Sequence, residues 1–344
     1  MKNSPFISAL TTGENSTTPV WFMRQAGRSL PEYRATKGTT NILDAISEPE
    51  LAAKITLQPV ERYGVDAAVL YSDIIVPVNS IGFGVEIEAG VGPVTKDPYR
   101  SVQDLSRLEG FDAVSSTPYV LETIKILKSQ LEVPLIGFAG APFTVASYLI
   151  EGRPTRTFEA TKAMMHGDSN TFKRLMERLA EITWLSLQGQ IEAGVDAVQI
   201  FDSWIGNLSA FEYGTFVAPH TQYVVEKVKQ LSVPIIHFGT NTTHLLGEFA
   251  KIATDGVSLD HRSSIAASVE TLGKDRAIQG NLDPILCLTT EEVMLQEARR
   301  VLSESRSAKK YVFNLGHGVL PQTNPTMLEK LVEFVHKNGA ELRQ

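Results

Sequence analysis

Cysteine is nearly absent from this chain of 344 residues, in which Cys287 stands alone. A single thiol excludes an intramolecular disulfide and a metal site built from several thiolates. Long apolar runs are missing too, since no stretch approaches the roughly 20 residues that span a bilayer. The first ten residues also lack the basic start and apolar core of a secretory signal. We therefore expect a cytoplasmic protein with no membrane partner.

An excess of positive charge is absent as well, because the net charge is −7. Proteins that bind nucleic acids normally present a broadly basic face, so no nucleic-acid partner is expected. Glycine-rich phosphate loops are lacking: Gly82-Phe83-Gly84 has no third glycine, and no P-loop is present. These absences disfavour an open, doubly wound nucleotide-binding sheet.

No linker, low-complexity tract or short repeat interrupts the chain, which predicts a single domain. The Ser-, Thr- and Asn-rich stretch 11–18 predicts that residues 1–18 form a mobile N-terminal tail. The folded domain would then occupy residues 19–344.

Short β-rich apolar runs alternate with amphipathic helical patterns along this domain. The predicted strands are Val20–Met23, Ala67–Tyr71, Leu135–Phe138, Ala197–Phe201, Pro234–Phe238, Gly256–Leu259, Ala277–Gln279 and Tyr311–Asn314. The predicted helices include Pro49–Tyr63, Thr117–Leu131, Thr171–Ala193, Ala210–Gln230, Thr290–Ser303 and Pro325–Lys337. Eight such units close most naturally into a single-domain α/β fold, the (β/α)8 or TIM barrel.

The first predicted strand ends in two arginines four residues apart, Arg24 and Arg28, with Gly27 between them. A guanidinium offers paired donors that match a carboxylate or phosphate, and a glycine allows a tight turn. Arg34 and Lys37 follow closely. A local cluster of cations on an acidic chain indicates a small anionic ligand, although a solvated basic turn remains the alternative.

Polar side chains collect where the other predicted strands end, which is where barrel enzymes carry their active sites. Asp202, Asp260 and Asp283 are expected to cap or brace neighbouring loops. For Asp73 and His317, a structural role and a functional role both remain open. His317 stands between two glycines, in Gly316-His317-Gly318.

Two long motifs resemble the signatures of the uroporphyrinogen decarboxylase family. Met23-Arg24-Gln25-Ala26-Gly27-Arg28, followed by Leu30-Pro31-Glu32-Tyr33-Arg34, is similar to the first. Gly137-Phe138-Ala139-Gly140-Ala141-Pro142-Phe143-Thr144, with Tyr148 and Glu151-Gly152, is similar to the second. Further blocks in the same order are Ser72-Asp73-Ile74, Phe201-Asp202-Ser203-Trp204, Gln279-Gly280-Asn281-Leu282-Asp283-Pro284 and Asn314-Leu315-Gly316-His317-Gly318.

The resemblance implies a (β/α)8 barrel, usually a homodimer, that decarboxylates the four acetate side chains of uroporphyrinogen III to give coproporphyrinogen III in haem biosynthesis, without a cofactor or metal. It implies catalytic roles for Asp73 and Arg24. It implies a substrate site made of Arg24, Gln25, Ala26, Gly27, Arg28, Lys37, Asp73, Tyr148, Ser203 and His317.

This chain departs from the family pattern at a few positions. Lys37 stands where the family more often has arginine, which keeps the charge but loses the planar fork. His261 stands where tryptophan is usual, and Pro77 lies one place early. We hypothesise that Asp73 stabilises the cation that forms when a pyrrole is protonated. Arg24, Asp73 and a bound water remain alternatives as the proton donor.

Three other functions compete with this interpretation. A zinc-dependent corrinoid methyltransferase of a related barrel family would need thiolates beside histidine, yet no cysteine lies two places after His237. A glycoside hydrolase would need two carboxylates at the mouth. A tetrapyrrole-binding protein without activity is expected to lack Asp73. The stretch 151–170 is interpreted as an irregular excursion, either a lid or a plain surface loop.

Overall fold

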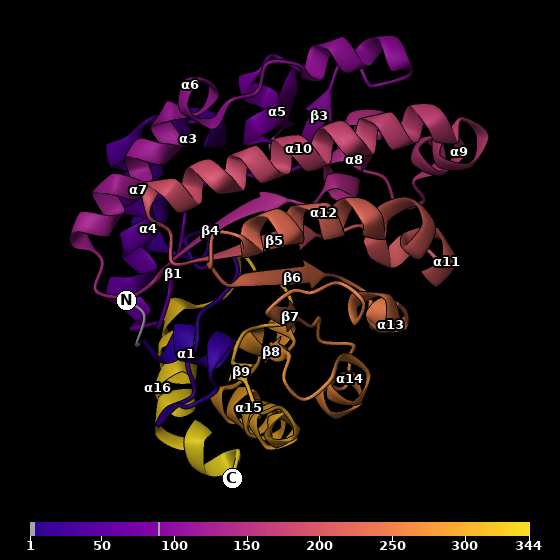
Figure 1. Ribbon diagram of the computed structural model, residues 1–344. Coiled ribbons are helices and arrows are strands. Elements are labelled where there is room, and N and C mark those ends of the chain that lie inside the picture. The colour runs from indigo at the N-terminus through magenta and orange to yellow at the C-terminus, as the bar shows by residue number, and fades with distance from the viewer. Residues whose placement is uncertain (1–3, 89) are drawn as a thin grey trace.

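The computed structural model describes residues 4–88 and 90–344 (Figure 1). Its main sheet holds seven parallel strands. In their order across the sheet they are β1 (Ala68–Val69), β4 (Leu135–Gly140), β5 (Ala197–Asp202), β6 (Ile235–Gly239), β7 (Gly256–Ser258), β8 (Ala277–Gln279) and β9 (Tyr311–Val312). A separate antiparallel hairpin is formed by β2 (Val85–Glu88) and β3 (Gly92–Thr95).

Helices cover the outer face of the curled sheet (Figure 1). Those that precede β4 are α1 (Pro5–Thr11), α2 (Pro31–Lys37), α3 (Ile42–Ser47), α4 (Pro49–Tyr63), α5 (Val76–Ser80), α6 (Ala113–Ser116) and α7 (Pro118–Gln130). Those that follow are α8 (Pro142–Glu151), α9 (Glu159–Gly167), α10 (Ser169–Ala193), α11 (Ala210–Glu212), α12 (Ala218–Lys229), α13 (Leu246–Phe249), α14 (Ile265–Leu272), α15 (Glu291–Glu304) and α16 (Pro325–Leu342). Short 3₁₀ helices are Val102–Leu108, Ile205–Asn207, Thr243–Leu245, Pro284–Leu288 and Ser305–Ser307.

Hydrophobic periodicity locates these elements well. Seven of the predicted strands overlap strands of the sheet, and α4 has the predicted bounds, with Pro49 in its first turn and Gly64 in the left-handed conformation after its end. The single helix expected over Ala210–Gln230 is divided instead by a π-helical turn, Tyr213–Val217.

The predicted strand Val20–Met23 is reduced to a single bridge, in which Val20 pairs with Phe313 beside β9. On its other side, the Val20 carbonyl accepts the Asp66 N–H at 2.8 Å. Beyond Val20, side chains replace the ladder: Phe22 N–H donates to Gln25 Oε1 at 3.0 Å and Met23 N–H to Asn314 Oδ1 at 3.3 Å. The expectation of a regular first strand is therefore wrong.

The N-terminal segment is not a free tail over residues 5–11, because these form α1. Ser4 accepts the Ile7 N–H at 3.3 Å and caps the helix. Phe6 is fully buried, and its ring meets Trp21 edge-on at 6.4 Å between centroids. The tail prediction is wrong here because Phe6, Ile7 and Leu10 form a buried apolar face. The prediction depended on the polar composition of residues 11–18, which does not extend to this segment. Residues 1–3 of the predicted tail lie outside the described residues.

Within the described ranges, none of the helices combines the length and the apolar character that crossing a bilayer requires.

Candidate active site

The residues 23–28, here called the arginine turn, form a tight loop after the Val20 bridge. Arg24 has a φ of 58°, an uncommon conformation for a residue with a side chain. A Cβ on Gly27 would lie 2.9 Å from the Arg24 carbonyl oxygen, so this position requires glycine. Gln25 is fully buried, and its Nε2 donates to the Ala67 carbonyl at 3.1 Å. The Gln25 side chain therefore holds the turn from within, and its predicted role in substrate binding stays a prediction.

The two arginine side chains of the turn are exposed. In the described part of the chain, neither guanidinium has a hydrogen bond or an ion pair. Arg34 braces the turn by donating to the carbonyls of Arg28 and Ser29, at 2.6 and 3.2 Å. Lys37 is not free either, because its ammonium donates to the Thr40 carbonyl just beyond α2. Arg24 and Arg28 are thus the cations that remain available to an anion.

Asp73 follows β1 in the loop that leads to α5. Its Oδ1 accepts the Ile75 N–H at 3.1 Å. Burial raises the pKa of this carboxyl above its usual range, while the Ile75 N–H and then the Arg24 charge oppose the shift. Among the ion pairs of residues 4–88 and 90–344, none includes Asp73. A desolvated carboxylate without a fixed counter-charge is typical of a functional site.

His317 lies in the turn after β9, and its pKa responds to the same Arg24 charge that acts on Asp73. Its Nδ1 accepts the Gly318 N–H at 2.7 Å, so the proton of the neutral ring resides on Nε2. Burial lowers the pKa of His317 to about 4, and the Arg24 charge lowers it further in the same direction. A Cβ on Gly318 would lie 2.5 Å from Arg24 Cδ. The glycine after His317 therefore makes room for the Arg24 side chain.

Tyr148, on α8, completes this group. Burial raises the pKa of its hydroxyl. The Asp73 charge raises that pKa further, whereas the Arg24 charge lowers it. Arg24 thus influences Asp73, Tyr148 and His317 alike, although the three come from different strand-to-helix connections. The structure brings these four predicted residues to one space.

Three other predicted residues lie in the arginine turn and after β5. Ala26 and Gly27 are half-buried within the arginine turn. Ser203 follows β5, where its carbonyl accepts the Thr240 hydroxyl at 2.5 Å. The Ser203 hydroxyl is partly exposed and has no partner among the described residues.

A row of aromatic rings, here called the aromatic floor, was missed in the sequence. It consists of Phe138 on β4, Phe201 on β5 and Phe238 on β6, and it continues to the His317 ring. Successive centroids lie 5.3, 5.8 and 6.1 Å apart, and each pair meets edge-on. Phe138 and Phe201 keep partial exposure, whereas Phe238, the ring next to His317, is buried. Each of these phenylalanines is indistinguishable in sequence from an ordinary core residue.

The remaining strand-end aspartates are structural, as expected. Asp202 is fully buried and accepts the Thr144 hydroxyl at 2.9 Å. Asp260 is also fully buried and accepts the Asn241 N–H at 2.6 Å. Asp283 caps a 3₁₀ helix by accepting the Ile285 N–H at 3.0 Å. Asp202 and Asp260 thus brace neighbouring segments and Asp283 its own helix, which leaves none of them as a free carboxylate pair of the kind that glycoside hydrolysis requires.

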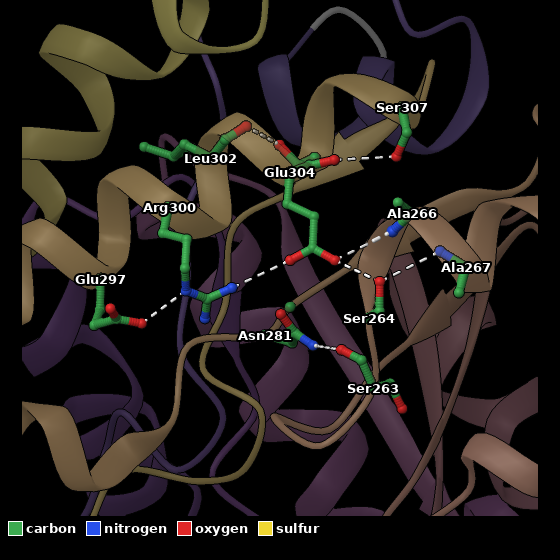
Figure 2. A network of polar contacts seen from close by, with 12 residues as sticks. Ser263, Ser264, Ala266, Ala267, Asn281, Glu297, Arg300, Leu302, Glu304 and Ser307 are labelled. Carbon is green, nitrogen blue, oxygen red and sulfur yellow. Dashed lines mark hydrogen bonds and ion pairs between the residues drawn. The ribbon is translucent and has the colours of Figure 1, made fainter.

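The loop after β7 is fixed against the His317 turn. Asn281 Nδ2 donates to the carbonyls of Asp260 and Ser263, at 2.9 and 2.7 Å. Figure 2 shows how this clamp continues to the helices outside, where Glu304 accepts the Ser264 hydroxyl at 2.6 Å. A Cβ on Gly316 would lie 2.2 Å from the backbone nitrogen of His261, so the two turns are in close contact.

Within the described ranges, no group of three or more His, Cys, Asp or Glu side chains is placed to hold a metal ion. His237 turns toward the helices, where its Nε2 lies 3.4 Å from Asp202 Oδ2 and its ring stacks on Phe249 at 4.3 Å. Cys287 is buried, and burial raises the pKa of its thiol to about 12. Neither side chain faces the group around Arg24.

The fold is shared with solved enzymes of low sequence identity. A methyltransferase from Methanosarcina mazei has a TM-score of 0.79 at 18% identity, with 97% of this chain and 98% of that chain covered. A B12-independent methionine synthase from Shewanella has a TM-score of 0.57 at 15% identity, with 85% and 86% covered. At these identities the similarity establishes the architecture alone.

Sequence comparison identifies the family. A uroporphyrinogen decarboxylase of Salinispora tropica is 47% identical over 336 residues, covering 97% of this chain and 90% of the relative. The enzyme of the same name from Geobacillus kaustophilus is 46% identical over 336 residues, covering 97% of both chains. The model of the family described as uroporphyrinogen decarboxylase (URO-D) matches residues 1–338. The chain therefore belongs to the uroporphyrinogen decarboxylase family.

Proposed function

We propose that this protein is a carboxy-lyase that converts uroporphyrinogen III to coproporphyrinogen III by removing its four acetate carboxyl groups, a step of haem biosynthesis. Membership of the family supports this reaction. The observation that carries it is the half-buried carboxyl of Asp73, which has no ion-pair partner in the described ranges, with the free guanidinium of Arg24 nearby.

The substrate carries its carboxylates around a flexible ring of four pyrroles, and it acts as its own electron sink. Protonation of a pyrrole carbon makes that ring cationic. The bond between the acetate methylene and its carboxyl then breaks with loss of carbon dioxide, and its electrons flow into the ring, to which the methylene is directly attached. A proton adds to the exocyclic methylene that results, and the ring carbon releases the proton that it had gained, which leaves a methyl group on a restored pyrrole. A propionate lies one carbon too far away, which explains why four carboxyl groups survive. The protein therefore has to bind the substrate, orient it and stabilise the developing charge.

Asp73 supplies the fixed negative charge. Its carboxylate accepts the pyrrole N–H groups and stabilises the cation that develops on protonation. Burial makes this interaction stronger than it would be in water. The aromatic floor places apolar rings beside the charged groups, so the macrocycle is held in surroundings that exclude part of the water.

The other polar groups recognise the periphery of the ring. Arg24 and Arg28 hold acetate and propionate carboxylates, since their guanidinium groups match a carboxylate fork. Arg24 additionally orients the reacting acetate. His317 donates from Nε2, because its Nδ1 is occupied by the Gly318 N–H. Tyr148 and Ser203 offer hydroxyl groups.

The direct test is an anaerobic assay of the purified chain with uroporphyrinogen III. Successive loss of carboxyl groups, ending in a tetracarboxylate product, is expected. Absence of carbon dioxide release would overturn the proposal. Stoichiometric zinc together with methyl transfer to or from a corrinoid would instead support the methyltransferase alternative.

We further propose that the sheet closes into an eight-stranded (β/α)8 barrel, with residues 19–23 acting as the first strand. Support comes from hydrogen bonds on both edges of Val20. Further support lies inside, where Trp21 Nε1 donates to Gln279 Oε1 and Gln279 Nε2 donates to Gln199 Oε1, both at 2.9 Å. These bonds connect the first segment to β8 and β5 across the interior.

We also propose that the folded unit, α1 included, works as a cytoplasmic homodimer. Size-exclusion chromatography with light scattering tests the oligomeric state, and a monomer at assay concentration would contradict it.

A further inference from the structure

The residues 152–158, here called the arginine arch, connect α8 to α9 and carry two more free cations. Arg153 and Arg156 are both exposed. In the ranges 4–88 and 90–344, neither has a hydrogen bond, an ion pair or an aromatic partner. The arch itself contains no acidic residue; Glu151 and Glu159 flank it, and in the described ranges neither forms an ion pair with its arginines.

Both ends of the arch are fixed. Gly152 ends α8 with a φ of 76°, and a Cβ there would lie 2.5 Å from Pro98 Cγ. The Gly152 carbonyl accepts the Thr95 N–H at 2.8 Å, which ties the arch to β3. At the other end, Phe158 is only 3% exposed. The arch is therefore anchored at each side of its two arginines.

The helix that follows is held as firmly. Glu151 Oε1 accepts both the backbone N–H and the hydroxyl of Thr161, at 2.8 and 2.7 Å. Lys162 and His166 contact Glu212 of α11, at 3.3 and 3.0 Å. In Figure 1, where β6 points to the right, α9 and α11 lie together at that end of the molecule. The arch thus belongs to the end of the sheet at which the strands finish.

A chain of aromatic contacts connects the arch to the site. The Phe158 ring lies 5.5 Å from the Trp204 ring, and Trp204 meets Tyr148 edge-on at 5.9 Å. The Tyr148 hydroxyl is in turn influenced by Asp73 and Arg24. Through Trp204, Phe158 therefore connects the arch to the helix that carries Tyr148.

We propose that Arg153 and Arg156 form a second carboxylate-binding site, which holds peripheral carboxylates of the tetrapyrrole on the side of α8. This inference rests on the proposed function. The eight carboxylates of that substrate outnumber the forks that Arg24 and Arg28 provide, and a protein of net charge −7 repels a polyanion unless its cations are concentrated at the entrance. The backbone of the arch is fixed at both ends, so binding need not order the loop, and a guanidinium matches a carboxylate fork.

The test compares the double variant R153Q/R156Q with wild type in anaerobic steady-state kinetics. Each exposed guanidinium-carboxylate pair contributes about threefold in affinity, so KM for the octacarboxylate is expected to rise about tenfold at low salt. The kcat is expected to stay within about twofold, because the arch does not touch the reacting carbon. The KM effect should shrink at high ionic strength, and it should be smaller for the pentacarboxylate intermediate.

Two controls make the result specific. R153K/R156K keeps the charges and should recover most of the affinity. Arg306→Ala removes an exposed arginine that has no partner in the described ranges and lies before β9, at the opposite end of the sheet. An unchanged KM in the glutamine variant, or an equal rise for Arg306→Ala, would overturn the proposal.

A binding measurement separates this inference from the reaction. Uroporphyrin, the oxidised octacarboxylate, is titrated into the same variants and followed by calorimetry. Weaker binding by R153Q/R156Q, rescued by lysine, supports the arginine arch even if the wild type fails to release carbon dioxide. Equal binding by all variants refutes the arch even if decarboxylation is observed.

Discussion

Replacement of Asp73 by asparagine isolates the charge on which the proposed mechanism depends. Asparagine retains an Oδ1 that can accept the Ile75 N–H, as the carboxyl does at 3.1 Å. The loop before α5 should therefore keep its conformation. What disappears is the negative charge beneath the developing pyrrole cation.

The magnitude follows from Coulomb's law. Opposite unit charges about 4 Å apart at an effective dielectric constant near 20 attract by roughly 4 kcal/mol. Loss of that attraction in the transition state should lower kcat on the order of a thousandfold. The assay is anaerobic conversion of uroporphyrinogen III, with products separated by their number of carboxyl groups.

The same substitution should stabilise the fold. Burial raises the pKa of Asp73 in the folded protein, so its favourable contribution is present below the unfolded pKa of about 3.9 and is lost as pH rises through the folded-state pKa. Asp73→Asn removes this loss, and its melting temperature should exceed that of wild type at neutral pH. Replacement of an aspartate with a purely structural role would instead lower the melting temperature.

Asp283 provides a matched control, because its Oδ1 accepts the Ile285 N–H two residues on, at 3.0 Å. Asp283→Asn should keep near-normal turnover. The reasoning would be refuted if Asp73→Asn retained normal turnover, or if both variants lost activity equally.

Three further outcomes are expected. Gln25→Ala leaves two buried backbone groups unpaired and should lower the free energy of unfolding by roughly 3 kcal/mol, measured by urea denaturation; a loss below about 1 kcal/mol would contradict its role in the arginine turn. His317 should titrate at about 4 by NMR, and because its folded-state pKa lies below its unfolded value, stability should fall as pH drops from about 6.5 through that value; a pKa near 6.5 would show that burial and Arg24 do not control it. Glu304→Ala should lose roughly 1 to 2 kcal/mol of stability, since Glu304 accepts from Ser264 between α14 and α15, whereas Glu297→Ala, which breaks one exposed pair, should lose little; equal losses would argue against the network in Figure 2.

The helices and most strands could be predicted because burial against a sheet imposes a periodic pattern on the sequence. The first strand could not, because its backbone N–H groups are taken by two side chains, Gln25 three residues on and Asn314 far along the chain. The helix α9 was missed within the stretch 151–170, since its start depends on the contact between Glu151 and Thr161. Such tertiary contacts leave no local pattern.

The site shows the same division. Strand ends and the family resemblance select Arg24, Asp73 and His317, and the structure places them together. The sequence does not reveal that Gln25 faces inward, because its role depends on the Ala67 carbonyl of another segment. The arginine arch was likewise seen only as part of an excursion, since the absence of partners for its cations is a property of the folded chain.

In the proposed mechanism Asp73 lies beneath the centre of the macrocycle while arginines hold its edge. The most direct measurement is a structure of the protein with coproporphyrinogen III bound, prepared without oxygen. We expect Asp73 carboxylate oxygens within about 3 Å of the pyrrole nitrogens, with Arg24 and Arg28 on peripheral carboxylates. Pyrrole nitrogens turned away from Asp73, or an ion pair between Asp73 and Arg24 in the complex, would contradict it.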